Sequence, residues 1–335
     1  MTLGILFALL SGLCNGLFSA PMKMIPRWRW ENIWLIFILT SCLLMPAVMV
    51  SITIGDWSVL HAEAPRSAVV AAAGFGFAWG FGAILFGLSV DRLGVSLANS
   101  LVIGLSSALG SLLPLIMQGA LRLEPRQIVL FVGIVTFLVG VWLCGSAGRL
   151  RETVGAAGSV SRNVTTGILF SVGSGIMSAI FNVGYTLALP IADTGERLGY
   201  TRFSATNFIW LLMLATGAIP NIAFCLYLMR RNRTGPLYSG SQWSRGLALS
   251  ILMGLLWGGS IFLYGAATPR LGPIAPSIGW PLSLAAALLV ANLMGVLLGE
   301  WRSANAKAVR FMRLGILTLV SAMVIIAAST RVGAR

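Results

Sequence analysis

Long apolar runs separated by short polar segments fill this chain from end to end. A helix needs about 20 apolar residues to cross the hydrocarbon core of a bilayer, and ten runs reach roughly that length. They are continuous, without the period-two alternation of a transmembrane barrel. The pattern therefore predicts an all-α integral membrane protein with ten transmembrane helices, over residues 3–20, 33–53, 68–90, 95–118, 127–146, 166–188, 206–229, 246–268, 273–298 and 309–329.

Composition and charge support a membrane protein and suggest its orientation. Hydrophobic residues make up 57% of the 335 residues and charged residues 10%, whereas a soluble chain carries about 25% charged residues. The net charge of +14 would suggest a nucleic-acid partner in a soluble protein, but here most Lys and Arg lie between apolar runs, so no nucleic acid is expected. Of the 23 Lys and Arg, 15 fall on one set of alternate connections and 8 on the other. The positive-inside rule places the richer set in the cytoplasm and both termini outside.

The two halves of the chain carry the same motif. The third run contains Trp79-Gly80, Phe86-Gly87 and Arg92-Leu93-Gly94, and the eighth contains Trp257-Gly258, Tyr264-Gly265 and Arg270-Leu271-Gly272, each 178 residues later. The first and sixth runs match at a constant offset of 163, as in Gly4-Ile5-Leu6-Phe7 against Gly167-Ile168-Leu169-Phe170. A tryptophan, an aromatic residue and an arginine in one register indicate a duplicated unit.

The duplication predicts an inverted architecture. Each unit holds five runs, in residues 1–150 and 165–335, with a cytoplasmic linker at 151–164. Because five is odd, the second unit enters the membrane from the opposite side. Two inverted repeats are typical of secondary transporters, which bind substrate near the membrane midplane between the repeats. We therefore expect a carrier that works by alternating access.

Aromatic and polar residues at membrane depth are candidates for the substrate site. Trp79 and Trp257 lie near the middle of their runs, although tryptophan favours the interface. They are expected to form aromatic walls of a cavity, or else to pack on the closely spaced glycines beside them. Amides and aromatic hydroxyls suit a neutral, hydroxyl-rich solute such as a sugar, or alternatively hold helices together. These further substrate candidates are Asn15, Asn182, Tyr185, Asn207 and Tyr264.

Coupling and gating candidates lie at the ends of the runs. No acidic residue falls in the middle of a run, which weakens a claim of proton coupling. Glu31 and Glu300 are the nearest substitutes, and Lys23 follows a proline-rich break after the first run. Arg92 and Arg270 mirror each other and are candidate gate residues, or alternatively caps of helix C-termini.

Catalytic chemistry has little support in the sequence. The single histidine, His61, lies in a connection, the four cysteines lack metal-ligand spacing, and no acid pair lies within a run. We therefore expect neither an enzyme nor a cofactor nor a metal site. A channel is disfavoured because no filter motif is present, and the sequence leaves the oligomeric state open.

Several segments resemble one known family. Ala20-Pro21-Met22-Lys23, the segment from Pro26 to Glu31, the stretch from Trp79 to Gly94 and Gly299-Glu300-Trp301 are similar to the bacterial L-rhamnose–proton symporter family. The resemblance covers nearly the whole chain. It implies the fold of the drug/metabolite transporter superfamily, in the bacterial inner membrane, and uptake of L-rhamnose with protons.

One segment departs from that family. Where the rhamnose carriers have a more polar stretch with tyrosine and glutamine, this chain has Pro273-Ile274-Ala275-Pro276-Ser277-Ile278-Gly279-Trp280. If this segment, including Trp280, contacts substrate, the specificity differs from rhamnose. The expected function is a secondary transporter of L-rhamnose or a related deoxy sugar, with proton symport left open. The alternative is an exporter or exchanger of another small metabolite.

Overall fold

The structure is a computed structural model that describes residues 1–25, 27–93, 95–117, 124–155, 164–272, 275–297, 299, 301–302 and 304–332. Within these residues there are ten helices long and apolar enough to cross a membrane, and no β-strand. Helices are expected because lipid offers no partner for backbone N–H and C=O groups. The ten crossings confirm the number and order of the predicted spans.

Most crossings are single helices, and two are composite. The first is α1 (Thr2–Leu17), followed by the short 3₁₀ helix η1 (Ala20–Met24), and the second joins α2 (Trp30–Ile38), the π-helical segment η2 (Leu39–Leu44) and α3 (Met45–Thr53). The remaining crossings are α5 (Arg66–Leu93), α6 (Val95–Met117), α7 (Pro125–Gly155), α8 (Val164–Arg197), α9 (Arg202–Asn232), α10 (Trp243–Leu271), α11 (Ala275–Leu297) and α12 (Ala306–Ser329).

Several helices extend beyond the apolar runs because polar residues define their ends. Thr201 caps α9 by accepting a hydrogen bond from the Ser204 amide at 3.1 Å, and Asn305 caps α12 by accepting one from the Ala308 amide at 2.7 Å. Arg233 ends α9 in the left-handed region, with φ of 54°. Helix α7 continues to Gly155, so the expected linker at 151–164 begins as helix, and residues 156–163 lie outside the described residues.

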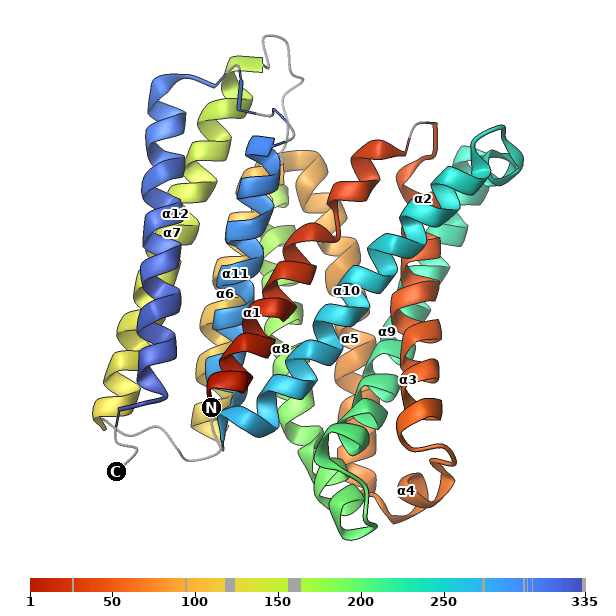
Figure 1. Cartoon of the computed structure of the whole chain (residues 1–335). Coiled ribbons are helices and arrows are strands. Elements are labelled where there is room, and N and C mark those ends of the chain that lie inside the picture. The colour runs from red at the N-terminus through yellow and green to blue at the C-terminus, as the bar shows by residue number, and fades with distance from the viewer. Residues whose placement is uncertain are drawn as a thin grey trace.

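Helix directions alternate along the chain (Figure 1). In this view α5 runs upward and α10 downward, so the two tryptophan-bearing helices are antiparallel, and α1 begins and α12 ends toward the lower face. We call the face where α1 begins and α12 ends the terminal face, and the opposite face the linker face. Helices α7 and α12 pack together at one edge, while α2, α3 and α9 lie at the other.

The two halves pack across each other with the same contacts. Helix α1 packs on α10 and α11, and its counterpart α8 packs on α5 and α6. Gly4 of α1 lies against Arg270 and Leu271, and Gly167 of α8 lies against Arg92 and Leu93. These glycines let the helices approach closely, as is common in membrane packing. Helices α1, α5, α6, α8, α10 and α11 surround the centre of the molecule.

Candidate substrate site

The indoles of Trp79 and Trp257 meet at the centre of the molecule. Their ring centroids are 5.3 Å apart and the rings are nearly parallel, at 15°. Phe181 of α8 continues the aromatic surface 5.0 Å from Trp79, and Phe37 of α2 does so 5.8 Å from Trp257. The two residues therefore form one shared aromatic wall between α5 and α10.

The glycines next to these tryptophans contact other helices, α9 and α3. A side chain at Gly80 would meet Gly217 and Pro220 of α9, and one at Gly258 would meet Met45 of α3. These glycines therefore allow α5 and α10 to pack closely on α9 and α3, while Trp79 and Trp257 contact each other at the centre.

A cavity of about 150 Å³ lies beside this wall. We call it the central cavity. Its aromatic lining comprises Trp79, Phe181, Trp257, Tyr264 and Trp280, and its polar lining comprises Ser11, Asn15, Ser106, Ser178, Ser260 and Ser283. All six central helices contribute to it. Five of the eight predicted substrate residues thus line one cavity: Asn15, Trp79, Trp257, Tyr264 and Trp280.

The polar groups of the central cavity suit a neutral hydroxylated solute. Ser11 and Ser283 bond each other across α1 and α11 at 2.9 Å. The buried hydroxyl of Ser106 has no hydrogen-bond partner among the described residues. Each serine hydroxyl can both donate and accept, as sugar hydroxyls require, while the indole faces suit the apolar face of a sugar ring. No charged residue lines this cavity among the described residues.

Asn182 of α8 is hydrogen-bonded to Tyr264 in the wall of the central cavity. Its Oδ1 accepts a hydrogen bond from the Tyr264 hydroxyl at 2.6 Å, and its Nδ2 donates to the carbonyls of Gly110 at 2.7 Å and Pro276 at 3.3 Å. It thus joins α8 to α6, α10 and α11. Asn182 lies just outside the cavity lining and fixes the orientation of Tyr264 within it.

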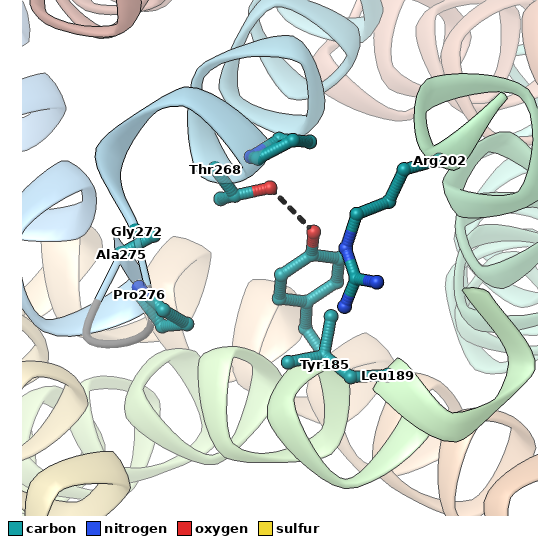
Figure 2. A pocket seen from close by; sticks show the side chains of 8 residues that line it. Tyr185, Leu189, Arg202, Thr268, Gly272, Ala275 and Pro276 are labelled. Atoms are coloured by element: carbon teal, nitrogen blue, oxygen red, sulfur yellow. Dashed lines mark hydrogen bonds between the residues drawn. The ribbon is translucent and has the colours of Figure 1, made fainter. Parts of the chain in front are cut away.

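Tyr185 lies one turn further along α8 and lines a second cavity, of about 200 Å³ (Figure 2). We call this the terminal-side cavity. Its lining is Tyr185, Leu189, Arg202, Thr268, Pro269, Gly272, Ala275 and Pro276. The Tyr185 hydroxyl bonds Thr268 Oγ1 at 2.7 Å, and its ring stacks on Trp210 at 4.5 Å.

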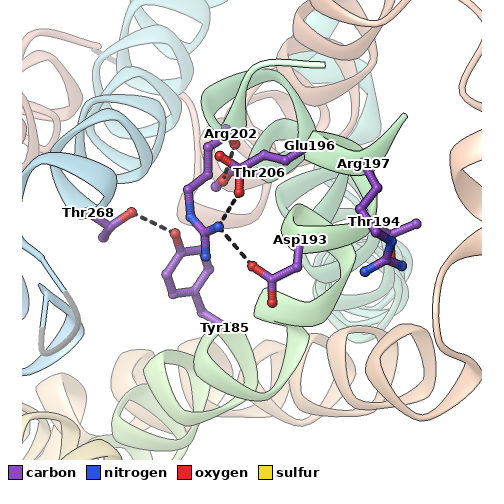
Figure 3. A network of polar contacts seen from close by, with 8 residues as sticks. All are labelled: Tyr185, Asp193, Thr194, Glu196, Arg197, Arg202, Thr206 and Thr268. Atoms are coloured by element: carbon purple, nitrogen blue, oxygen red, sulfur yellow. Dashed lines mark hydrogen bonds and ion pairs between the residues drawn. The ribbon is translucent and has the colours of Figure 1, made fainter. Parts of the chain in front are cut away.

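An ion-pair network borders the terminal-side cavity (Figure 3). Arg202 Nη1 donates to Asp193 Oδ1 at 2.8 Å and to Glu196 Oε2, which joins the start of α9 to the end of α8. Arg197 bonds Thr194 Oγ1 at 2.8 Å and points away from the cavity. The sequence reasoning placed Arg202 in a connection, so its position beside the pathway was missed.

The remaining predicted substrate residue lies apart from both cavities. Asn207 of α9 donates to Thr53 Oγ1 of α3 at 3.1 Å. Its buried Oδ1 has no partner among the described residues.

The two candidate gate arginines occupy matching positions in the two halves. The Arg92 guanidinium lies 4.8 Å from the centre of the Phe170 ring, and that of Arg270 lies 5.0 Å from the centre of the Phe7 ring. Each also donates to a carbonyl in its own last turn, Leu88 and Ala266 respectively. Cation–π contact and capping at a helix C-terminus are both favourable, so each arginine joins its own half to the first helix of the other.

The other coupling candidates lie near the linker face. Glu31, only 4% exposed, lies in the first turn of α2, and its Oε1 accepts hydrogen bonds from Asn232 Nδ2 at 2.9 Å and Thr234 Oγ1 at 3.0 Å. Nearby, Tyr238 donates to the Asn32 carbonyl at 2.9 Å, and burial raises the pKa of Tyr238 to about 12. Lys23 is exposed on η1, and Glu300 lies outside the described residues. Neither Glu31 nor Lys23 is among the described residues that line the central cavity or the terminal-side cavity.

The serine hydroxyls of the central cavity were missed because serine is common wherever membrane helices pack closely. At two of these serines, the internal repeat of the sequence could have indicated a role in the site. Ser11 belongs to the Ser-Gly pair repeated as Ser174-Gly175, and Ser178 stands 163 residues after Asn15, in the register of the repeat.

Comparison with known proteins agrees with this geometry. A family model described as L-rhamnose-proton symport protein matches residues 1–333. The chain belongs to the L-rhamnose–proton symport protein family. Relatives in the family include the L-rhamnose-proton symporters of Citrobacter koseri and Salmonella gallinarum, each 26% identical over 331 residues, or 96% of this chain and 96% of theirs. The expected family resemblance is confirmed.

A solved structure described as "Crystal structure of protein" shares the fold. It is 17% identical, with a TM-score of 0.56, and the match covers 99% of this chain and 98% of that one. The likeness extends over all ten crossings and shows the fold alone.

Proposed function

We propose that this protein is a secondary transporter that carries L-rhamnose or a closely related deoxy sugar across the bacterial inner membrane, together with protons, by alternating access. The observation that carries the proposal is the central cavity, where the Trp79–Trp257 wall faces a set of serine hydroxyls. Its size suits a small solute, because sites for drug-sized ligands measure about 300–1,000 Å³. Membership of a symporter family supports transport rather than catalysis.

The balance of apolar and polar lining supports a deoxy sugar. Two indoles and a phenyl ring offer a surface for a methyl group and the C–H face of a pyranose. The hydroxyl-bearing serines come mostly from the opposite helices, α1, α6 and α11. A 6-deoxy sugar combines one apolar end with several hydroxyls and fits this division. Trp280, from the segment that departs from the family pattern, contributes to the same lining and is proposed to adjust specificity.

The alternating-access mechanism rests on the two-unit architecture. We propose that residues 1–150 and 165–335 are inverted repeats, supported by the antiparallel α5 and α10 and by the matched contacts of α1 and α8. The reciprocal arginine–phenylalanine contacts join the two units at opposite ends. Near-equal units can exchange conformations, which gives inward-open and outward-open states of similar energy.

Gradient-driven uptake tests this function directly. Purified protein in proteoliposomes should accumulate radiolabelled L-rhamnose when an inward proton gradient is imposed, and a protonophore should reduce uptake to simple equilibration. L-Mannose, which carries a hydroxymethyl group in place of the methyl group, should compete less well because its C6 hydroxyl loses hydrogen bonds against the aromatic wall.

Three results would contradict parts of the proposal. Uptake that ignores the gradient would exclude symport and favour an exchanger, and absence of saturable uptake would exclude a rhamnose carrier. Equal competition by both sugars would mean that the aromatic wall does not contact the methyl group. Liposomes without protein provide the baseline for leakage.

A further inference from the structure

The terminal-side cavity lies in series with the central cavity. Both are lined by α8, α10 and α11, and one residue connects their walls. Asn182 accepts from Tyr264, which lines the central cavity, and donates to the carbonyl of Pro276, which lines the terminal-side cavity. The two cavities therefore share a hydrogen-bonded wall.

Polar groups in the terminal-side cavity come from three helices. Tyr185 of α8 and Thr268 of α10 present their bonded hydroxyls, and Arg202 of α9 extends its guanidinium beside the Tyr185 ring (Figure 2). Both carboxylate bonds of Arg202 use Nη1. A guanidinium has five N–H donors, so Nε and Nη2 still offer donors to a ligand.

The charge balance disfavours an anionic ligand. One guanidinium faces two carboxylates, Asp193 and Glu196, so the negative charges outnumber the positive one and the group does not attract an anion. The rest of the wall, formed by Leu189, Pro269, Ala275 and Pro276, is apolar. Hydroxyl-binding donors on one side and an apolar surface on the other reproduce the character of the central cavity. The volume of about 200 Å³ is also sufficient for any solute that fits the 150 Å³ of the central cavity.

We propose that the terminal-side cavity is a second binding site for the same neutral deoxy sugar, which occupies it on its way between the central cavity and the terminal face. Arg202, Tyr185 and Thr268 bind sugar hydroxyls, and the two carboxylates hold the guanidinium over the cavity. The inference rests on the proposed sugar specificity and adds a second site to it.

Protection of engineered cysteines tests the second site. In a background without the four native cysteines, Leu189→Cys reports on the terminal-side cavity and Ser178→Cys on the central cavity. The full chain is placed in nanodiscs, where both faces are accessible, and treated with a polar thiol reagent with or without L-rhamnose. At a sugar concentration about ten times the dissociation constant, an occupied site should react about tenfold more slowly.

Two further variants separate direct occupancy from a change relayed through the protein. In a Trp79→Ala background, which weakens the central site, L-rhamnose should still protect Leu189→Cys. Arg202→Gln should remove that protection, whereas Arg197→Gln should not, because Arg197, the last residue of α8, points away from the cavity. Circular dichroism of each variant checks that the helices are retained.

The outcomes distinguish the second site from the proposed function. Protection of Ser178→Cys without protection of Leu189→Cys would overturn the second site and leave the rhamnose carrier intact. Loss of Leu189→Cys protection in the Trp79→Ala background would also overturn it, since the effect would then come from the central cavity. Protection of neither cysteine would overturn the rhamnose specificity itself.

Discussion

The indoles of Trp79 and Trp257 come from different halves of the chain and touch over a nearly parallel face. Aromatic pairs of this kind contribute about 0.5–1.5 kcal/mol beyond the burial of their area. The repeated motif predicted that both rings would either face a cavity or pack on neighbouring glycines, but not that they would contact each other. A sequence predicts which residues share one face of a helix. It does not predict the angle at which two helices cross, because that angle depends on the packing of side chains from distant segments.

Removing either ring should weaken sugar transport more than it lowers the amount of folded protein. For Trp79→Ala and Trp257→Ala we expect a loss of about 1 kcal/mol in substrate binding, or about a fivefold rise in KM. The measurement is the concentration dependence of uptake in proteoliposomes. Trp142→Ala is the matched control, because Trp142 is 61% exposed on α7, away from both cavities. Unchanged KM in both central variants would mean that the rings serve packing alone.

Helix α5 carries its packing glycines and Trp79 close together. Gly76 and Gly80 lie against the backbone of α9, at Met213 and Gly217, and the Trp79 ring lies against Gly217 as well as against Trp257 of α10. Positions three apart, such as Gly76 and Trp79, share a helix face. The close approach of α5 to α9 thereby fixes the direction in which the indole of Trp79 points.

A methyl group at Gly80 should destabilise this contact. A Cβ there would lie 2.4 Å from the Gly217 carbonyl oxygen and from Pro220 Cγ, and overpacking of this kind costs about 1–3 kcal/mol. Gly80→Ala should therefore lower the thermal unfolding temperature in detergent. Gly74→Ala on the same helix should leave it unchanged or raise it, because nothing lies within 4 Å of that position and alanine favours helix. Equal unfolding temperatures for both variants would show that α5 and α9 do not pack this closely.

The interior of the second crossing was not predictable from hydropathy. The run 33–53 marks one span, but η2 interrupts it as a π-helical segment shortly before Pro46. Proline has no backbone N–H to donate, and π-helical turns are a known way to absorb an irregularity in a helix. The short helix α4 (Ser58–Glu63), which carries His61, was likewise read only as a connection. Hydropathy reports length and burial in lipid, not the hydrogen-bond register inside a span.

At the scale of the whole molecule, the ten crossings followed from the sequence because lipid permits few alternatives for the backbone. The cavities did not follow. The terminal-side cavity combines Tyr185, Arg202, Thr268 and Pro276 from four helices. Arg202 lies between two apolar runs, which predicts only a position in a connection, and the structure places it as the first residue of α9 beside Tyr185.

The orientation predicted from charge remains to be tested. With 15 of 23 Lys and Arg on the connections of the linker face, the positive-inside rule places that face in the cytoplasm and the terminal face outside. A C-terminal fusion to alkaline phosphatase should then be active, and a fusion to green fluorescent protein should be dark. Fusions in the α7–α8 connection should give the opposite pair of signals. A fluorescent C-terminal fusion would reverse the orientation, and the terminal-side cavity would then open to the cytoplasm.

The parallel indoles of α5 and α10 have one more consequence. Two such rings 5.3 Å apart couple their electronic transitions, and one ring is carried by each half of the chain. Any step of the transport cycle that moves the two halves apart must also weaken the coupling between the transitions of these two indoles. The protein therefore contains its own optical probe, so that near-ultraviolet circular dichroism can follow its cycle without an attached label.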